Sequence, residues 1–304
     1  MVALLPAPGS AQPYPFKPVK IVVPAQPGGG LDLVGRTVAD QLGRAMNQSI
    51  IVENSAGGGG AIASQAVARA APDGYTLMVG YVGTHGTNPA VRKLPYDAIQ
   101  DFTAIAMVGG TRNVLVVHPS VPAADLRSFV DYARHNAGKL NYATGGIGLL
   151  NHLALEQFRA AAGFDAVYAH YRGIGGGQIQ VLMPGLAAAL PHIRAGKIKP
   201  LAVTGFERHP LIPGVPTFEE SGFKGFDGVQ WYGIVGPAKL PEEITKRLNA
   251  EINKALASPA LRQRLSGEAI DPMPMTPEQF ASFIRADIAR WSALARERGI
   301  SLDD

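Results

Sequence analysis

The fold is decided by residues 19–42, which read VKIVVPAQPGGGLDLVGRTVADQL. The run Val19–Val23 is rich in β-branched residues and predicts a buried strand. A glycine-bearing turn follows, and apolar side chains then recur at helical spacing on one face: Leu31, Val34, Val38 and Leu42. Strand, turn and amphipathic helix in this order are typical of an α/β sheet with parallel strands.

The same alternation continues along the chain. In the first part, strands are also predicted at Ile50–Glu53, Thr76–Gly80, Ile105–Val108 and Val114–Val117. The middle part has strands at Leu140–Ala143, Ala166–His170, Gln178–Met183 and Leu201–Thr204, and helices near Asp125–His135, Leu150–Ala162 and Leu186–Ala195. The last part has one strand, Gln230–Val235, and then helices at Glu242–Ala257, Pro259–Ser266 and Pro277–Arg298. The pattern predicts two parallel sheets covered by helices.

We expect the strand at Gln230–Val235 to return to the first sheet, so that the chain crosses between two lobes near Pro119 and again near Val229. A length of 304 residues suits two lobes of about 100 to 150 residues each. Residues 13–118 with 230–304 would form the first lobe, and residues 119–229 the second. Two crossings form a hinge, and a hinge creates a cleft between the lobes.

The composition indicates a folded globular protein. Hydrophobic residues make up 46% of the chain and charged residues 17%, which allows a sizeable core. The absence of cysteine excludes disulfides, thiolate nucleophiles and zinc-cysteine sites. The net charge of +4 comes without a dense Lys/Arg run, so we expect no nucleic-acid partner.

Residues 1–12 are apolar and rich in small residues, like the end of a signal peptide that has lost its charged front. Cleavage after Ala11 would fit this interpretation, which places the mature protein outside the cytoplasm. A disordered terminus or a wrongly assigned start codon explains the same residues. Beyond them, no apolar run reaches the roughly 20 residues of a membrane helix.

Glycine-bearing loops precede three predicted helices, at residues 26–32, 54–60 and 144–152. The unpaired N–H groups and the positive dipole end of a helix start attract anions, and glycine lets a ligand approach the backbone. Glycines also permit sharp turns without any ligand, so one loop alone decides nothing. Three such loops at strand ends together predict an anion site.

Known nucleotide-binding and catalytic motifs do not occur. Leu31 and Asp32 follow Gly30 where a P-loop requires Lys and then Ser or Thr, and Asn151 stands where the dinucleotide fingerprint requires a glycine. The chain has no G-x-S-x-G or H-E-x-x-H, and its seven histidines lack metal-ligand spacing. We expect no cofactor, no metal and no catalytic residue. An α/β enzyme, either a hydrolase or a nucleotide-dependent one, is the alternative.

In the order of its landmarks the chain resembles the Bug or TctC family, the periplasmic solute-binding proteins of tripartite tricarboxylate transporters. The landmarks are Tyr14–Pro18, Val22–Pro24, Pro27–Gly29, Val52–Asn54, Ala71–Leu77, Leu94–Asp97, Asn113–Val117, Leu140–Tyr142, Leu190–Lys197 and Val215–Thr217. The resemblance implies a two-lobed periplasmic-binding-protein (Venus flytrap) fold. It also implies a monomer in the periplasm that delivers a di- or tricarboxylate, an acidic amino acid or an aromatic acid to the transporter's membrane subunits. An orphan ligand sensor is the alternative within this interpretation.

The resemblance implies that backbone N–H groups and small hydroxyls hold the carboxylate. Carried over to this chain, the site comprises Gln26, Pro27, Gly28, Gly29, Gly83, Thr84, His85, Gly145, Gly148, Asn151, His152 and Tyr171. The sequence departs from the family pattern after Tyr171, where about two helical turns are missing before Gln178. Either the pocket wall is truncated or a loop has been left out. Gln26 is a second departure, since this position is usually apolar or small; it either contacts the ligand or faces solvent.

Five side chains, two of them from the set above, have two interpretations each. His85 and His152 either line the cleft or pack inside the protein. Arg112 either binds the carboxylate directly or is a solvated surface arginine. Trp231 and Tyr232 either form an aromatic wall of the cleft or belong to the core.

Overall fold

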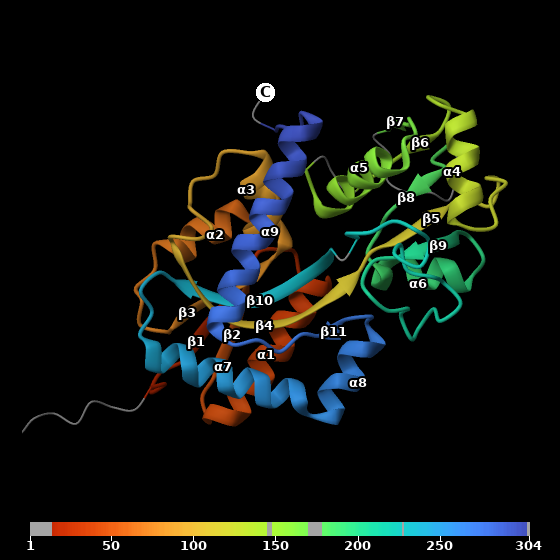
Figure 1. Ribbon diagram of the computed structural model, residues 1–304. Coiled ribbons are helices and arrows are strands. Elements are labelled where there is room, and N and C mark those ends of the chain that lie inside the picture. Colours follow the sequence, from red (N-terminus) through yellow and green to blue (C-terminus); the bar gives the residue numbers. More distant parts are fainter. Residues whose placement is uncertain (1–13, 145–147, 170–177, 227, 303–304) are drawn as a thin grey trace, which may run out of the picture.

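The computed structural model describes residues 14–144, 148–169, 178–226 and 228–302, which contain two sheets flanked by helices (Figure 1). The six-stranded sheet belongs to the first lobe and the five-stranded sheet to the second. Figure 1 shows the two lobes side by side, joined where β4 leads into β5 and where the chain returns into β10. The predicted two-lobed α/β fold is confirmed.

The first sheet contains strands of both directions. Its order is β11-β4-β10-β3-β1-β2, with bounds β1 (Val19–Val23), β2 (Ile50–Asn54), β3 (Thr76–Tyr81), β4 (Phe102–Arg112), β10 (Val229–Pro237) and β11 (Asp271–Pro272). β1 runs parallel to β2 and β3, whereas β10 runs antiparallel to β3 and β4. The prediction of parallel strands is therefore right for β1, β2 and β3 and wrong for β10. β4 carries the chain toward the second lobe and β10 brings it back, so these neighbouring strands must run in opposite directions.

The second sheet has the order β7-β6-β8-β5-β9, with bounds β5 (Val114–Val117), β6 (Asn141–Tyr142), β7 (Val167–Tyr168), β8 (Val181–Leu182) and β9 (Lys199–Val203). β6 runs parallel to β7 and β8, and β5 antiparallel to β8 and β9. β5 thus lies in the second sheet, and the first crossing falls at Asn113 instead of near Pro119. Asn113 alone separates β4 from β5, so the sequence carries no loop signal at the crossing.

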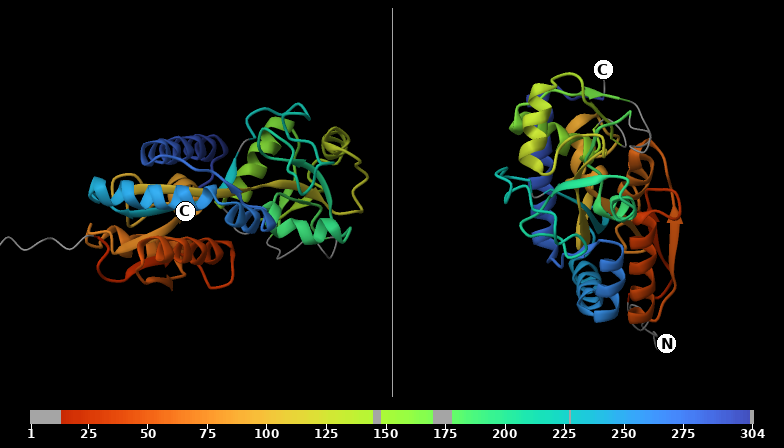
Figure 2. Two further views of the ribbon diagram at one scale, coloured as in Figure 1. Left: turned by 90° about the horizontal axis from the view of Figure 1, so that it is seen from below. Right: turned by 90° about the vertical axis from the view of Figure 1, so that its right-hand side faces the viewer.

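Helices cover both faces of the first sheet (Figure 2). α1 (Gly30–Met46) and α7 (Glu242–Ala257) pack together on one face. On the other face lie α2 (Ala61–Ala68), α3 (Asn88–Val91) and α9 (Pro277–Arg298). The remaining helices are α8 (Pro259–Gly267) in the first lobe and α4 (Leu126–His135), α5 (Leu150–Ala162) and α6 (Leu186–Arg194) in the second; η1 (Gly58–Gly60) and η2 (Gly83–Thr87) are short turns.

The helix starts and apolar faces follow the sequence closely. Val34, Val38 and Leu42 of α1 are buried against the alternate side chains of β1, as predicted, and Leu31 is half-buried. α9 begins after Thr276, whose hydroxyl accepts the N–H of Gln279 in a capping box. Among the described helices, none is long and apolar enough to cross a membrane.

Candidate functional site

The candidate site lies at the carboxyl ends of β1 and β3, on the side of the first sheet where the chain crosses to the second lobe. Tyr81 at the end of β3 pairs with Tyr232 near the start of β10. Val229, the first residue of β10, pairs with Arg112 at the crossing. The loops that follow β1 and β3 therefore face the second lobe, where open α/β sheets bind their ligands.

The turn after β1 is exposed, and Asp32 in the first turn of α1 holds its shape. Residues 26–30 are all exposed. Gly28 has a φ of 92°, which favours glycine, and its N–H donates to Asp32 Oδ2 at 2.9 Å. The N–H of Gly28 is thus already used, whereas the first-turn amides of α1 have no acceptor within the helix. Of the predicted site, Gln26 to Gly29 are the exposed part.

Asp32 is anchored from three directions. Its carboxylate also accepts Arg36 Nε at 2.9 Å and Asn54 Nδ2 at 3.0 Å, and Asn54 donates to the carbonyl of Ala25. The hydrogen bond from Arg36, with that from Gly28, lowers the pKa of Asp32 to about 2 against the effect of burial. Asp32 is therefore ionised, and Arg36 offsets its charge beside the proposed anion site. Sequence reasoning missed this residue, although an acid four residues before an arginine is a recognisable helix pair.

The turn after β3 supports the site from within. Thr84 and His85 have no exposed surface, and all of η2 is buried. Thr84 donates its hydroxyl to the Tyr81 carbonyl at 3.2 Å, and its own carbonyl accepts the Tyr96 hydroxyl at 2.9 Å. A Cβ on Gly83 would stand 2.3 Å from the Tyr81 ring, so the turn folds tightly back on its strand. The side chains of Thr84 and His85, which the family resemblance placed in the pocket, face the core here.

The imidazole of His85 is a packed, neutral group. It meets Phe102 in a T-shaped contact with ring centroids 4.5 Å apart, and its Nδ1 lies 2.8 Å from the Thr84 hydroxyl. Burial lowers the pKa of His85 to about 3, so it carries no charge near neutral pH. Of the two interpretations of His85, packing is the one that the structure shows.

The start of α5 places Gly148, Asn151 and His152 together. The Gly148 N–H donates to His152 Nδ1 at 3.3 Å, and the His152 N–H donates to the Asn151 side chain at 3.1 Å. The His152 ring stacks on Tyr142 with an interplanar angle of 16°, and only 6% of the residue is exposed. Its pKa is lowered, chiefly by burial. His152 thus shapes the turn before α5 instead of offering a charged side chain. Gly145 and Tyr171 lie outside the described residues, as does the departure from the family pattern at residues 173–177.

The glycine run of residues 57–60 is fastened to the turn after β3. The Gly59 carbonyl accepts the Tyr81 hydroxyl at 3.2 Å and Asn88 Nδ2 at 2.9 Å. All four glycines have positive φ. At Gly59 the run therefore offers a carbonyl to its neighbours and not an N–H group. The run packs next to η2 and supports the turn after β3.

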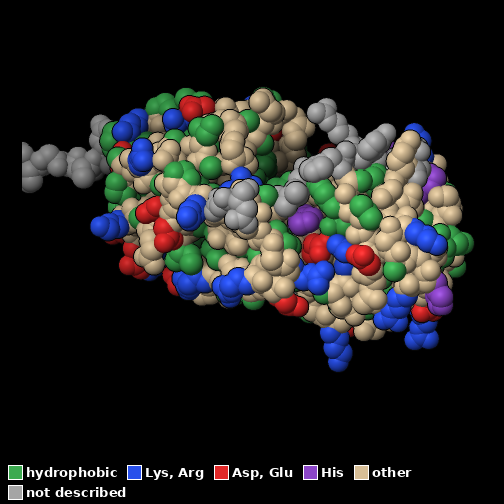
Figure 3. Space-filling view, turned by 90° about the horizontal axis from the view of Figure 1, so that it is seen from above, with side chains coloured by type: hydrophobic (Ala, Val, Ile, Leu, Met, Phe, Trp, Pro, Cys, Tyr) green, Lys and Arg blue, Asp and Glu red, His purple; other side chains and the backbone are tan. Residues whose placement is uncertain are grey.

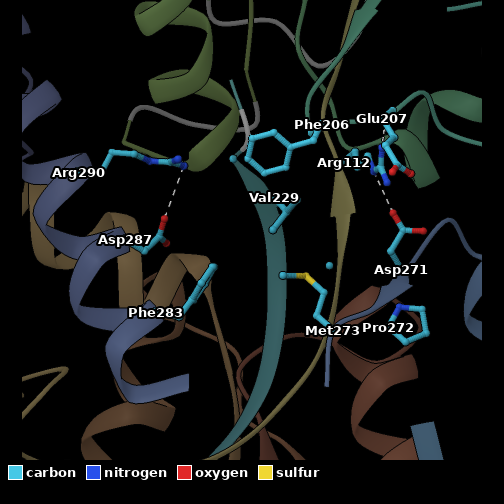
Figure 4. A pocket seen from close by; sticks show the side chains of 13 residues that line it. Arg112, Phe206, Glu207, Val229, Asp271, Pro272, Met273, Phe283, Asp287 and Arg290 are labelled. Carbon is cyan, nitrogen blue, oxygen red and sulfur yellow. Dashed lines mark hydrogen bonds and ion pairs between the residues drawn. The ribbon is translucent and has the colours of Figure 1, made fainter. Parts of the chain in front are cut away.

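A separate cavity of about 450 Å³ lies behind the hinge (Figure 4). Its apolar lining comes from Phe206, Val229, Pro272, Met273 and Phe283. Figure 4 shows an arginine and aspartate pair on each side of it: Arg112 with Asp271, and Arg290 with Asp287. α9 supplies Phe283, Asp287 and Arg290 to this cavity and also contacts η2 and α3, so the same helix touches the cavity and the turn after β3.

Arg112 takes neither of the two predicted roles. Its Nε donates to Asp271 Oδ2 at 3.0 Å, its guanidinium also donates to the Glu207 carbonyl, and its side chain is 18% exposed. His209 Nε2 lies 3.6 Å from the other oxygen of Asp271. Burial acts to raise the pKa of Asp271, but the proximity of His209 and the charge and hydrogen bond of Arg112 lower it overall. Arg112 therefore ties β11 of the first lobe to the second-lobe segment at Glu207.

Trp231 and Tyr232 belong to the core, the second of their two interpretations. Trp231 has no exposed surface and donates its Nε1–H to Asp287 Oδ2 at 2.8 Å, while Trp291 donates to the other oxygen at 2.9 Å. Tyr232 is 4% exposed, and burial raises its pKa. Its hydroxyl stands 3.4 Å from where a Cβ of Gly30 would be, so it supports the start of α1 from beneath.

Basic and acidic side chains are interspersed among the described residues on the face drawn in Figure 3. The net charge of the chain is +4. On this face the charges alternate in sign over short distances, so attraction of an acid there depends on local donors and not on a broad positive field.

The model of the tripartite tricarboxylate transporter family receptors, TctC, matches residues 34–300 of this chain. BugT from Bordetella pertussis (strain Tohama I) is 31% identical over 309 residues, which cover 97% of this chain and 94% of BugT. The similarity to BugT thus extends over nearly the whole length of both chains.

Solved structures show the same architecture. Rpa4515 of R. palustris, solved with adipate, is 31% identical with a TM-score of 0.84, over 95% of this chain and 99% of that one. MatC from Rhodopseudomonas palustris, with bound malate, is 32% identical with a TM-score of 0.79, over 92% of this chain and 99% of that one. The similarity includes both lobes and the hinge between them.

Proposed function

The chain belongs to the tripartite tricarboxylate transporter receptor family (TctC), and on this premise we propose that it captures a small carboxylate between its lobes and delivers it to the membrane subunits of such a transporter. The resemblance to this family is confirmed. Members of the family are receptors, which argues against the alternative of an α/β hydrolase or nucleotide-dependent enzyme.

The exposed turn at residues 26–30 carries the proposal. It places the first-turn amides of α1 on the cleft side of the first lobe, and these amides attract an anion through both their N–H groups and the helix dipole. Asp32 holds the turn rigid from behind, which limits the entropy lost on binding. The start of α5, with Gly148 and Asn151, is the proposed counterpart in the second lobe.

A dicarboxylate is the ligand class we propose first. Rpa4515 was solved with adipate and MatC with malate, and both ligands carry two acid groups. Two lobes that each present backbone donors can hold one acid group each. Tricarboxylates, acidic amino acids and aromatic acids are the other members of the proposed class.

The location and assembly follow from the same premise. We propose that the protein works in the periplasm as a monomer, after cleavage following Ala11, with the residues up to Asn113 and from Val229 onward as one lobe. A ligand sensor without a transporter is the second candidate, since capture of an acid serves either role.

A thermal-shift screen tests the proposal. The ligand-stripped protein is heated with adipate, malate, citrate, glutamate and benzoate, and with succinamide and glucose as neutral controls. At 100 times its dissociation constant a ligand adds about 2.7 kcal/mol of stability. We expect one class of acids to raise the melting temperature and the neutral controls to leave it unchanged. A screen in which no acid acts would overturn carboxylate capture.

The Asp32→Asn variant tests the site itself. Losing the charge weakens the bonds from Gly28 and Arg36, so the turn loosens and affinity for the acid found in the screen should fall about tenfold. Asp40→Asn is the matched control, because Asp40 lies on the same helix, is exposed and pairs only with Arg44 in the described chain. Equal affinities for Asp32→Asn and the parent, measured by calorimetry, would remove the turn from the site.

A further inference from the structure

The chain after α9 makes contacts with both lobes. α9 ends at Arg298, the following Gly299 has a φ of 62°, and the Ile300 N–H donates back to the Ala295 carbonyl at 2.8 Å. The Leu302 N–H then donates to the carbonyl of Val91, the last residue of α3, at 2.8 Å. This backbone bond fastens the segment 299–302 to the first lobe.

The Leu302 side chain reaches the second lobe at Gly148. A Cβ on Gly148 would stand 2.8 Å from Leu302 Cδ1 and 2.8 Å from Val91 Cγ2, and Gly148 has a φ of 77°. Gly148 therefore lets the turn before α5 approach Leu302 and Val91 more closely than any other residue would allow. Leu302 thus packs at a junction between α3 and the turn that starts α5.

A second contact between the lobes lies at Arg298, one residue before the segment. Arg298 Nη2 lies 3.3 Å from Glu156 Oε2 on α5. Figure 1 shows this upper end of α9 next to α5, and the two helices are in contact. Glu156 is only 6% exposed and also accepts the Tyr142 hydroxyl and Arg159 Nη1. Tyr142 in turn stacks on His152, whose Nδ1 accepts the Gly148 N–H.

Two routes therefore lead from the end of the chain to the same turn. Leu302 touches Gly148 directly, and Arg298 acts through Glu156, Tyr142 and His152. From this convergence we propose that Arg298 and Leu302 are positioning residues of the ligand site, which hold the turn of residues 148–152 against the first lobe in its binding geometry. A test of this inference by ligand binding rests on the proposed function, whereas a test by amide hydrogen exchange does not.

Amide hydrogen exchange on the full-length, ligand-free protein tests the positioning role. In Leu302→Ala and Arg298→Gln, a peptide covering residues 148–155 should exchange about tenfold faster than in the parent, while peptides of β1 and β3 keep their rates. Leu302→Met keeps the volume and should restore slow exchange. Arg296→Gln is the matched control, because Arg296 is exposed in the same helical turn and should leave the peptide unchanged.

Binding supplies the second readout. With adipate and malate as the probes, both variants should bind about tenfold more weakly than the parent and Arg296→Gln should bind equally well. Unchanged exchange at residues 148–155 in both variants overturns the inference, as does faster exchange spread evenly over both lobes, since that reports general destabilisation. If the parent binds neither acid, the proposed carboxylate function fails for these probes and the exchange result alone decides the positioning role.

Discussion

The imidazole of His85 has no exposed surface and a folded pKa of about 3, far below the ordinary value of 6.5. At pH 5 the unfolded chain therefore binds a proton at this residue that the folded chain does not. The free energy of unfolding falls as the pH drops from about 7 toward 3, and this loss is complete only at the folded pKa. His85 thus makes the stability of the first lobe sensitive to mild acid.

The His85→Leu variant should remove this sensitivity. Between pH 7.5 and pH 5 the parent loses about 2 kcal/mol through His85, and the variant should lose that much less. Urea unfolding at the two pH values measures the difference. The exposed His135 provides a control, since His135→Gln should follow the parent. Identical losses in His85→Leu and the parent would show that the imidazole titrates normally in the folded protein.

Asp32 and Asp287 are buried carboxylates whose surroundings also decide their role. Asp32 organises the turn after β1, and Asp287 accepts the indole N–H groups of Trp231 and Trp291. Each replaces lost hydration by several donors, which is the condition for burying a charge. Neither residue belongs to a sequence motif, because their donors come from other elements.

At the scale of elements, the packing of α9 on the first sheet depends on a glycine in β10. Phe280 of α9 has no exposed surface, and its ring carbon Cζ lies 2.3 Å from where a Cβ of Gly233 would stand. Glycine is costly within a strand, so its presence marks a close approach. This approach holds α9, which lines the hinge cavity, close against β10.

Gly233→Ala should therefore lower the free energy of unfolding by about 1–3 kcal/mol through overpacking. Adding Phe280→Leu makes room for the new methyl group, so the double variant should cost less than the two single changes summed. Gly267→Ala, at an exposed position with nothing within 4 Å, should change stability by less than about 0.5 kcal/mol. Denaturant unfolding of the parent, the two single variants and the double variant measures this coupling. Strictly additive losses would argue that Phe280 of α9 does not pack against Gly233.

At the scale of the whole molecule, two sets of polar contacts join the lobes within the described part of the chain. Asp271 of the first lobe meets Arg112 at the crossing and His209 of the second lobe, and Arg298 of α9 meets Glu156 of α5. The Asp271 set lies at the hinge and the Arg298 pair at the end of α9. A movement of the lobes about β4 and β10 must therefore either break the Arg298–Glu156 pair or keep it as a second point of rotation.

Ligand closure is the expected movement. A compact chain of this length has a radius of gyration of about 19 Å. We expect the ligand-free protein to scatter with a larger radius, which falls toward that value when an acid that raises the melting temperature is added, because a bound ligand favours the closed state. Glucose should leave the radius unchanged. An unchanged radius at saturation with the stabilising acid would mean that capture occurs without closure.

The sequence by itself determined the elements whose causes are local. The alternation of strands and helices, the buried face of α1 and the capped start of α9 depend on residues a few positions apart, so periodicity and capping rules predict them. The order of landmarks along the chain also identified the family. Within the candidate site, the exposed turn at residues 26–29 could be predicted for the same reason, since its glycines directly precede a helix.

Only the tertiary structure decided the features that depend on distant partners. Sheet direction, the place of β5 and the burial of Thr84 and His85 depend on which strands and side chains pack together across the fold. Arg112 meets Asp271 and Glu156 meets Arg298 although more than a hundred residues separate each pair. No local pattern selects such partners, because the members of each pair meet only when the lobes assemble, and there their attraction offsets the cost of taking them out of water.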